Sequence, residues 1–256
     1  MELILLSSDT EGLFWNIVEQ DYFDYYFFIS DWALQKSHTQ IYFAIEHDNV
    51  VGLMLIYNDY IVQLRGNESA VRFLLDNLTL HKADVQAPAC FGSLLTEKYP
   101  RFLLKENIIL MSLKKGQEVF MVTMMPQLLS VADAPAVAEL MHLCYPEMWS
   151  EVTANNVEDL MNCKDAVWLG IKIDGNLAAF GHAMKTPKVS HVTWVATNPQ
   201  YQRRGYATSI VSSLIKECLV SSESTIIYVV ENNLTAKNIY MKAGFKPSKS
   251  YVFIKT

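Results

Sequence analysis

The sequence predicts an α/β protein with a mixed, mostly antiparallel sheet flanked by helices, divided into two domains. Hydrophobic periodicity in the second half alternates between strand-like and helix-like runs, with one β-α-β crossover among antiparallel strands. A polar, glycine-containing break, Lys114-Lys115-Gly116-Gln117, separates that half from the first. We therefore expect a smaller N-terminal α/β domain at residues 1–118 and a second domain at residues 119–256.

Composition bounds the classes of protein that the chain can belong to. With 51% hydrophobic and 19% charged residues, the chain is typical of a globular protein, and 256 residues suffice for two cores. A net charge of -6 argues against a general nucleic-acid binder, which normally has a basic surface. No apolar run reaches the roughly 20 residues that span a bilayer, and the N-terminal residues lack the positive flank of a signal peptide. We expect a protein that binds neither nucleic acid nor membrane.

The cysteines indicate a reducing compartment. There are four, Cys90, Cys144, Cys163 and Cys218, and none forms a C-x-x-C pair. Neither a zinc site nor a redox dithiol is indicated, so we expect no metal and a cytoplasmic location.

In the first half, apolar runs and turn residues define five elements. We expect a helix at 13–29, a hairpin of strands at 41–45 and 50–57, a strand at 60–65 and a helix at 68–78.

The second half shows clearer periodicity. Asp174-Gly175-Asn176 is typical of a tight hairpin turn, and Gly244 stands where a helix ends in a left-handed residue. We expect strands at 119–124, 166–173, 177–184, 191–197, 225–230 and 251–254, and helices at 133–144, 157–161, 205–220 and 233–243.

A candidate phosphate site lies where the strand at 191–197 passes into the helix at 205–220. Gln202-Arg203-Arg204-Gly205-Tyr206-Ala207 places a glycine and two arginines at this junction. The first turn of a helix offers unpaired N–H groups and partial positive charge, and Gly205 lets the backbone approach a diphosphate closely. An ordinary strand–helix turn with solvated arginines is the alternative, because short glycine motifs are common.

A second segment favours the phosphate interpretation. Asn233 stands at a helix start, where asparagine caps well, and Ala236 and Tyr240 follow on the same helical face. The Tyr240 hydroxyl can therefore point into the crevice beside the preceding strand. The alternative is a Tyr240 that only fills the core.

Together the two segments resemble a known family. Val195-Ala196-Thr197, Pro199 and Tyr201 to Ala207, followed by Glu231-Asn232-Asn233, Ala236, Tyr240 and Gly244-Phe245, resemble the GNAT superfamily of acyl-CoA-dependent N-acyltransferases. The order of strands extends the likeness over residues 119–256. The two-part layout, with the active half last, resembles glycine N-acyltransferase-like proteins. The first half is then either a GNAT-like domain that lost its cofactor site or a different small α/β domain.

The resemblance implies a role for each matching residue. Backbone groups of Val195 and Thr197 would pair with the pantetheine arm of acetyl-CoA or another acyl-CoA, Asn233 would contact that arm, and Tyr240 would protonate the departing thiolate. The whole cofactor-binding set that it implies is Val195, Ala196, Thr197, Gln202, Arg203, Arg204, Gly205, Tyr206, Ala207, Thr208 and Asn233.

The base that deprotonates the attacking amine is less well indicated. His191 stands four residues before Val195, where some members carry glutamate, and it shares a strand face with Thr193 and Val195. A strand-end histidine without chemistry is the alternative. Glu231 and His182 are poorer candidates, and Glu147 and Glu151 could select the substrate.

The function expected from the resemblance is transfer of an acetyl or other acyl group from acyl-CoA to a primary amine in a ternary complex. The acceptor would be a small molecule or a peptide. A non-catalytic acyl-CoA-binding sensor or scaffold is the rival from another class. The first domain would cover the acceptor side or form an interface, as in a homodimer.

Overall fold

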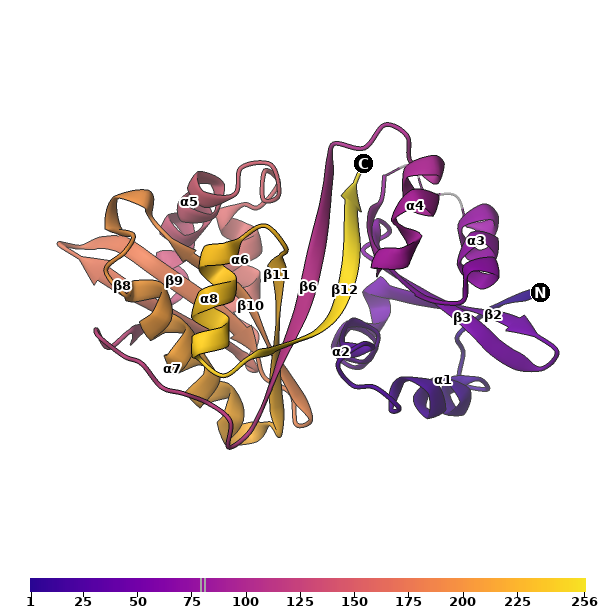
Figure 1. The fold of residues 1–256 in the computed structure, drawn as a ribbon, viewed down its shortest axis with the longest axis horizontal. Coiled ribbons are helices and arrows are strands. Elements are labelled where there is room, and N and C mark those ends of the chain that lie inside the picture. The colour runs from indigo at the N-terminus through magenta and orange to yellow at the C-terminus, as the bar shows by residue number, and fades with distance from the viewer. Residues whose placement is uncertain (79, 81) are drawn as a thin grey trace. The chain divides into compact units, whose positions relative to one another are not determined.

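The computed structural model describes residues 1–78, 80 and 82–256, which form two compact units. One unit comprises Met1–Ile109 with Lys249–Thr256, and the other comprises Leu110–Ser248. Each unit is an α/β layered structure, shown in Figure 1 with indigo at the N-terminus and yellow at the C-terminus. The boundary expected between residues 118 and 119 falls shortly after the chain passes from the first unit into the second.

The first unit is a sheet with helices on both faces. Its strands lie in the order β1-β2-β3-β4-β5-β12, antiparallel except for the pair β4 and β5. Its elements before β12 are β1 (Glu2–Leu5), α1 (Glu11–Val18), α2 (Tyr26–Leu34), β2 (Thr39–Glu46), β3 (Asn49–Tyr57), β4 (Ile61–Gly66), α3 (Glu68–Asn77), β5 (Asp84–Pro88), α4 (Gly92–Lys98) and the beginning of β6 (Leu104–Lys114).

Two cores hold these layers together. On one face α1 and α2 bury Phe14 and Phe28 against β2 and β3, and on the other α3 and α4 bury Leu74 and Leu95 against β3, β4 and β5. Each such side chain contributes roughly 1.5–3 kcal/mol of burial free energy. The prediction of a single helix at 13–29 is wrong, because this stretch contains two helices, α1 and α2. Between them the chain turns at Asp21, whose carboxylate accepts hydrogen bonds from the backbone N–H groups of Phe23 and Asp24.

Strand β12 (Lys246–Lys255) joins the first unit through Asp24. The Asp24 carboxylate accepts hydrogen bonds from Lys249 Nζ at 2.7 Å and Tyr251 Oη at 2.6 Å, and it pairs with the Arg65 guanidinium. Burial alone would raise the pKa of Asp24, but these partners outweigh it and hold that pKa below its ordinary value. The network ties β12 to Asp24, which stands more than 200 residues earlier in the chain, in the turn between α1 and α2.

The second unit repeats the same plan. Its strands lie in the order β6-β11-β10-β9-β8-β7, with β10 and β11 parallel. Its elements after β6 are β7 (Gln127–Leu128), α5 (Ala134–Cys144), α6 (Ala154–Met161), β8 (Ala166–Ile173), β9 (Asn176–Met184), β10 (Val189–Thr197), α7 (Tyr206–Ser221), β11 (Ser224–Val230), α8 (Leu234–Lys242) and the beginning of β12.

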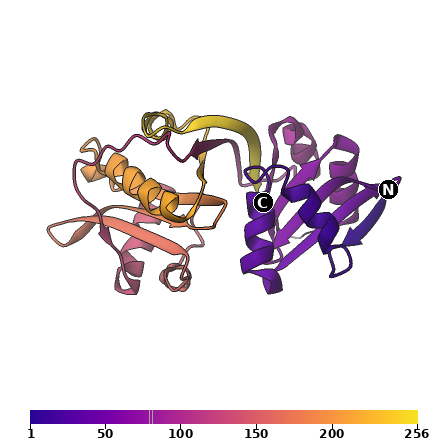
Figure 2. The same cartoon turned by 90° about the horizontal axis from the view of Figure 1, so that it is seen from below.

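Helices cover both faces of this sheet as well. Figure 2 shows α7 on one face and α5 and α6 on the other. Helix α7 buries Ile210, Leu214 and Cys218 along one stripe, as its periodicity predicts, and α5 packs Val137 and Met141 into the opposite core. The predicted α/β class with a mixed, mostly antiparallel sheet is confirmed.

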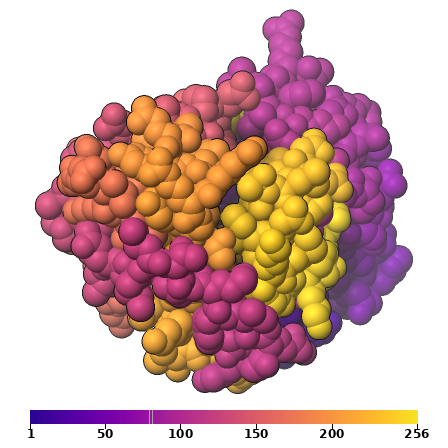
Figure 3. Space-filling model, turned by 60° about the vertical axis from the view of Figure 1, so that its left-hand side comes forward, coloured from indigo at the N-terminus to yellow at the C-terminus, as the bar shows by residue number. Residues whose placement is uncertain are grey.

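The predicted strand at 119–124 is wrong. Residues 119–126 have no regular structure, and the backbone N–H groups of Met121, Thr123 and Met124 donate to side chains of α7 instead of a neighbouring strand. Met121 N donates to Ser212 Oγ and Thr123 N to Ser209 Oγ, both at 3.0 Å. Figure 3 shows this segment in magenta, beside the orange of α7. The segment is therefore held along α7 through its backbone, while Val119, Phe120 and Val122 are exposed and belong neither to the sheet nor to the core.

Both units follow the order β-α-α-β-β-β-α-β-α-β, but their last strands are exchanged. β12, the last strand of the second series, pairs with β5 of the first unit, with Tyr251 opposite Pro88 and Ile254 opposite Val85. β6, the last strand of the first series, continues into the second unit and neighbours β11. Among the described residues, no helix combines the length and hydropathy needed to cross a membrane.

Candidate active site

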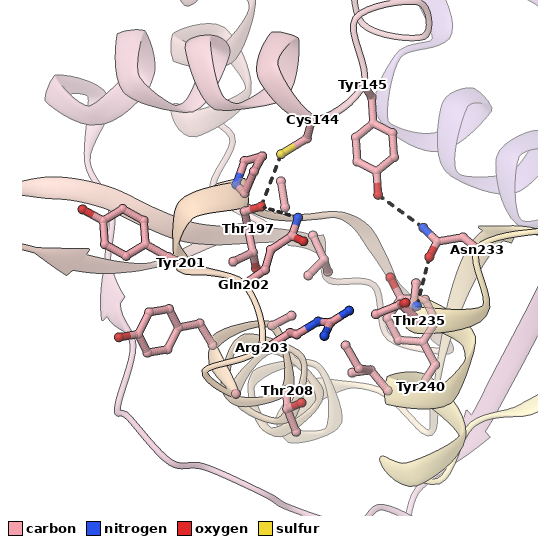
Figure 4. A pocket seen from close by; sticks show the side chains of 18 of the residues that line it. Cys144, Tyr145, Thr197, Tyr201, Gln202, Arg203, Thr208, Asn233, Thr235 and Tyr240 are labelled. Carbon is pink, nitrogen blue, oxygen red and sulfur yellow. Dashed lines mark hydrogen bonds between the residues drawn. The ribbon is translucent and has the colours of Figure 1, made fainter.

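A cavity of about 540 Å³ lies in the second unit, where β10 ends and α7 and α8 begin (Figure 4). It brings together three segments of the sequence, within residues 143–145, 195–208 and 233–240. Its lining comprises Leu143, Cys144, Tyr145, Val195, Ala196, Thr197, Pro199, Tyr201, Gln202, Arg203, Gly205, Tyr206, Ala207, Thr208, Asn233, Thr235, Ala236, Ile239 and Tyr240. Of the predicted cofactor-binding residues, all but Arg204 are in this set.

The cavity opens because two parallel strands separate. The ladder between β10 and β11 ends with Val192 opposite Ile227, whereas β10 stays paired with β9 as far as Thr197. The described residues 193–197 extend beyond the ladder, and Val195, Ala196 and Thr197 line the cavity. A strand edge that leaves its neighbour offers backbone N–H and C=O groups to an extended ligand.

The N-terminus of α7 supplies an anion site. Gly205 is the N-cap residue with φ +81°, and no side chain accepts a hydrogen bond from the first turn. The first-turn N–H groups have no acceptor within the helix, so they and the helix dipole favour an anion there. Arg203 is also left-handed, with φ +61°, a conformation that costs a non-glycine residue energy and is found at functional sites.

The side chains of Arg203 and Arg204 lie in different places, and only that of Arg203 lines the cavity. The Arg203 side chain reaches into the cavity between α7 and α8 (Figure 4), and it is the one residue with a formal charge among those that line it. Arg204 instead donates from Nη2 to the Gln200 carbonyl at 3.4 Å and lies over the ring of Tyr201 at 5.4 Å. The cavity thus has a net positive lining suited to phosphate groups.

The β10 end of the cavity is tied to α5. The Thr197 carbonyl accepts a hydrogen bond from Gln202 Nε2 at 3.4 Å and another from Cys144 Sγ at 3.5 Å (Figure 4). Burial raises the pKa of Cys144, partly offset by the bond to Thr197, so the thiol is protonated and unreactive at neutral pH. Gln202 and Cys144 therefore position the strand end.

Helix α8 is capped as the sequence predicts. Asn233 Oδ1 accepts from the Ala236 backbone N–H at 3.0 Å, and Asn233 Nδ2 donates to Tyr145 Oη at 3.4 Å (Figure 4). Tyr145 follows α5 and is a lining residue that sequence reasoning missed. Its only signal was its place in the loop between the first two helices of the second half.

Tyr240 lies in the last turn of α8 and lines the cavity, and it is buried, with 6% of its surface exposed. Burial raises the pKa of its phenol well above the ordinary value, and the neighbouring Tyr145 raises it further. The hydroxyl is therefore protonated across the whole physiological range, which is the state required of a proton donor.

A smaller cavity of about 100 Å³ adjoins the first. The two share Tyr145, Val195, Ala196, Asn233, Ala236 and Tyr240. The remaining lining of the smaller cavity is Met141, Met148, Trp149, Phe180, Thr193, Trp194, Tyr228, Val229 and Val230. Tyr240 thus stands where one cavity passes into the other.

His191 lies outside both linings. It is buried at the parallel end of β10, where its ring meets Tyr228 edge-on at 5.4 Å. Burial lowers its pKa to about 3. The other candidates, His182, Glu231, Glu147 and Glu151, are also not among the lining residues. Within the described part of the chain, no group of three or more His, Cys, Asp or Glu side chains is arranged to hold a metal ion.

Comparison with a family model finds a match to part of the chain. Residues 134–245, less than half of the chain, are similar to the Acetyltransferase (GNAT) family. Such a match supports acyl transfer in general. None of the curated proteins matches the chain.

Solved structures share the fold over nearly the whole chain. A protein from Drosophila has 14% identity and a TM-score of 0.77, with 99% of this chain and 97% of that one covered. A GNAT-family acetyltransferase from Colwellia psychrerythraea has 13% identity and a TM-score of 0.62, with 100% and 99% covered. A tandem GNAT protein from the clavulanic acid biosynthesis pathway has 12% identity and a TM-score of 0.60, with 100% and 98% covered. At these identities the likeness is one of fold.

Proposed function

We propose that the chain is an acyl-CoA-dependent N-acyltransferase that transfers an acyl group to a primary amine in a ternary complex. The observation that carries the proposal is the continuity of one cavity, from the open edge of β10 to the uncapped N-terminus of α7 and on to the Tyr240 hydroxyl. This arrangement matches a ligand with a diphosphate at one end and an extended amide-containing arm at the other.

The donor is held mainly by backbone groups. N–H groups from Arg203 to Thr208 would bind the diphosphate, with the Arg203 guanidinium beside it. Backbone groups of Val195 and Thr197, beyond the end of the ladder with β11, would pair with the amides of the pantetheine arm, and Asn233 would contact that arm from α8. Ala236 lies between Asn233 and Tyr240 and keeps the passage between α8 and β10 open.

The chemistry is direct attack on the thioester. The amine nitrogen forms a bond to the acyl carbon, the carbon–sulfur bond breaks, and the Tyr240 phenol gives its proton to the departing thiolate. The attacking nitrogen then loses its extra proton, which returns the phenol to its neutral form through solvent. The high pKa of Tyr240 keeps its proton in place until charge develops on sulfur.

A non-catalytic acyl-CoA sensor is the rival function. The presence of Tyr240 at the junction of the two cavities favours catalysis, because a sensor has no need of a buried proton donor there. CoA release measured with a panel of primary amines tests the choice. Tight binding of acetyl-CoA without turnover for any class of acceptor would favour the sensor.

His191 provides a test of where the proton goes. A histidine with a pKa near 3 is a weak base, and its side chain does not line the site, so His191→Gln is expected to change kcat by less than about 3-fold, whereas a true general base contributes about 10²-fold or more. The pKa of His191 is lower in the folded protein than in the unfolded chain. Its buried neutral ring therefore contributes fully to the free energy of unfolding above about pH 6.5, and this contribution is lost as the pH falls toward 3.

The measurements are steady-state kinetics and unfolding midpoints between pH 3 and 8. In His191→Gln the unfolding midpoint should fall less on acidification than in the wild type, while kcat stays close to the wild-type value. A 100-fold loss of kcat in a variant that unfolds like the wild type would assign the base to His191 instead.

The first unit is proposed to be a second copy of the same fold without a donor site, a layout like that of glycine N-acyltransferase-like proteins. Its helix α3 corresponds in order to α7, but the Asn67 side chain caps it by accepting from Ala70 N at 2.9 Å. Glu68 adds negative charge to the first turn, where α7 has none. At the N-terminus of α3 a first-turn N–H group is therefore already bonded to Asn67, and the Glu68 carboxylate would repel an anion.

We therefore expect one molecule of acyl-CoA to bind per chain. Isothermal titration calorimetry of the full chain with CoA should give a stoichiometry near one, and Gly205→Glu should remove all binding. A stoichiometry near two, or binding that survives in Gly205→Glu, would place a second site in the first unit.

A further inference from the structure

We propose that the smaller cavity binds the acyl group of the donor and selects an uncharged, apolar acyl chain longer than acetyl. The inference rests on the proposed function, because it needs the thioester to lie beside Tyr240. It adds the chemical class of the transferred group, which the match to a GNAT domain leaves open.

The position of the cavity supports this assignment. The larger cavity follows the open edge of β10, and the smaller one continues it toward the point where β10 and β11 begin to pair. This part of the smaller cavity is lined by Thr193 and Trp194 of β10 and by Tyr228 to Val230 of β11. A thioester placed beside Tyr240 would direct the carbons beyond its carbonyl into this space.

The walls are aromatic and sulfur-containing. Trp149 from the loop after α5 meets Trp194 edge-on at 5.4 Å between ring centroids. Met141, Met148 and Phe180 complete the apolar lining. Such side chains make many dispersion contacts with a hydrocarbon, and methionine adapts to irregular shapes.

Charge decides between an acyl chain and the amine acceptor as the occupant. None of the residues that line the smaller cavity is charged. An amine arrives as an ammonium ion, whose burial without a carboxylate is costly, and the aromatic faces recover only part of that cost. A hydrocarbon acyl chain is neutral and loses nothing by leaving water. The cavity therefore suits the acyl chain.

Size sets the length of the chain. About 100 Å³ is the volume that roughly three water molecules occupy in the liquid. An acetyl group, with one carbon beyond the carbonyl, would fill only part of it. A butyryl or isovaleryl group, with about three to four carbons beyond the carbonyl, would fill it.

The test compares the dissociation constants of CoA, acetyl-CoA and butyryl-CoA, measured by calorimetry on the full chain. Two further buried methylenes correspond to about a 10-fold tighter Kd for butyryl-CoA than for acetyl-CoA. Equal or weaker binding of butyryl-CoA, with acetyl-CoA and CoA both bound, would overturn the inference and leave the proposed function standing. Failure of every CoA compound to bind would overturn both.

Two variants make the comparison specific to the cavity. Val230→Phe should fill it, so that butyryl-CoA loses its advantage and binds no tighter than acetyl-CoA. Trp149→Ala should remove a wall and lower the preference about 3-fold or more. Each preference is a ratio taken within one variant, so a general loss of fold or of CoA affinity cancels.

Phe120→Ala is the matched control, because it removes an aromatic ring that is 51% exposed and lies outside both cavities. It should keep the 10-fold preference of the wild type. An unchanged preference in both Val230→Phe and Trp149→Ala would show that the acyl chain binds elsewhere and would overturn the inference.

Discussion

Replacing Gly205 with glutamate is expected to raise the Kd for acetyl-CoA by at least about 100-fold. Residue 205 has φ +81° at the N-terminus of α7, and any side chain there starts 2.8 Å from Thr123 Oγ1. A carboxylate at this point repels the diphosphate and occupies the approach to the first-turn N–H groups. Calorimetry with acetyl-CoA on the full chain measures the effect.

Gly175→Glu is the matched control. Gly175 has φ +82° and open space around it, in the turn between β8 and β9 away from the cavity. Both substitutions place a left-handed glutamate, which costs about 1–2 kcal/mol of stability. Only Gly205→Glu should lose donor affinity. Equal affinities for acetyl-CoA in the two variants would show that the diphosphate does not bind at α7.

Tyr240→Phe is expected to lower kcat by about 10²- to 10³-fold, with little change in the KM for acyl-CoA. The substitution keeps the buried ring and removes the proton that the thiolate would take, so it acts on the transition state alone. Because its pKa is raised by burial, Tyr240 should also impose no fall in rate up to about pH 10.

Tyr42→Phe provides the comparison for this variant. The Tyr42 hydroxyl donates to Gln40 Oε1 at 2.8 Å in the first unit, so this substitution also removes a hydrogen-bonded phenol but far from the proposed chemistry along the chain. CoA release should then be unchanged. If Tyr240→Phe retains at least half of the wild-type kcat, the thiolate receives its proton from another group.

The parts of the site that the sequence predicted are those made by short segments. The turn at Gly205, the cap at Asn233 and the helical spacing to Tyr240 each follow from local backbone chemistry, and all three residues line one cavity. The confirmed sheet and helices of the second unit follow from hydrophobic periodicity for the same reason.

Other parts depend on contacts that no local pattern records. Tyr145, Cys144 and Trp149 reach the cavities because α5 packs on the same sheet, and nothing in their neighbours indicates that position. His191 shares a strand face with Val195 by alternation, but β10 changes its pairing between Val192 and Trp194, where a bulge shifts the register with β9. Alternation alone could not predict that break.

The exchange of β12 has a consequence for how the chain is made. The first unit places Val252 and Ile254 in the same core as Leu74 and Leu95, so its sheet remains incomplete until residues near 250 exist. The ribosome adds about 5–20 residues per second, and an N-terminal domain usually folds before the later parts of the chain are made. Here the edge of β5 would stay unpaired for roughly 10 seconds or more while the second unit is translated. The first unit is thus the first to be synthesised and the last whose sheet is completed. During that interval the unpaired edge of β5 is exposed to pairing with a wrong strand and to chaperones.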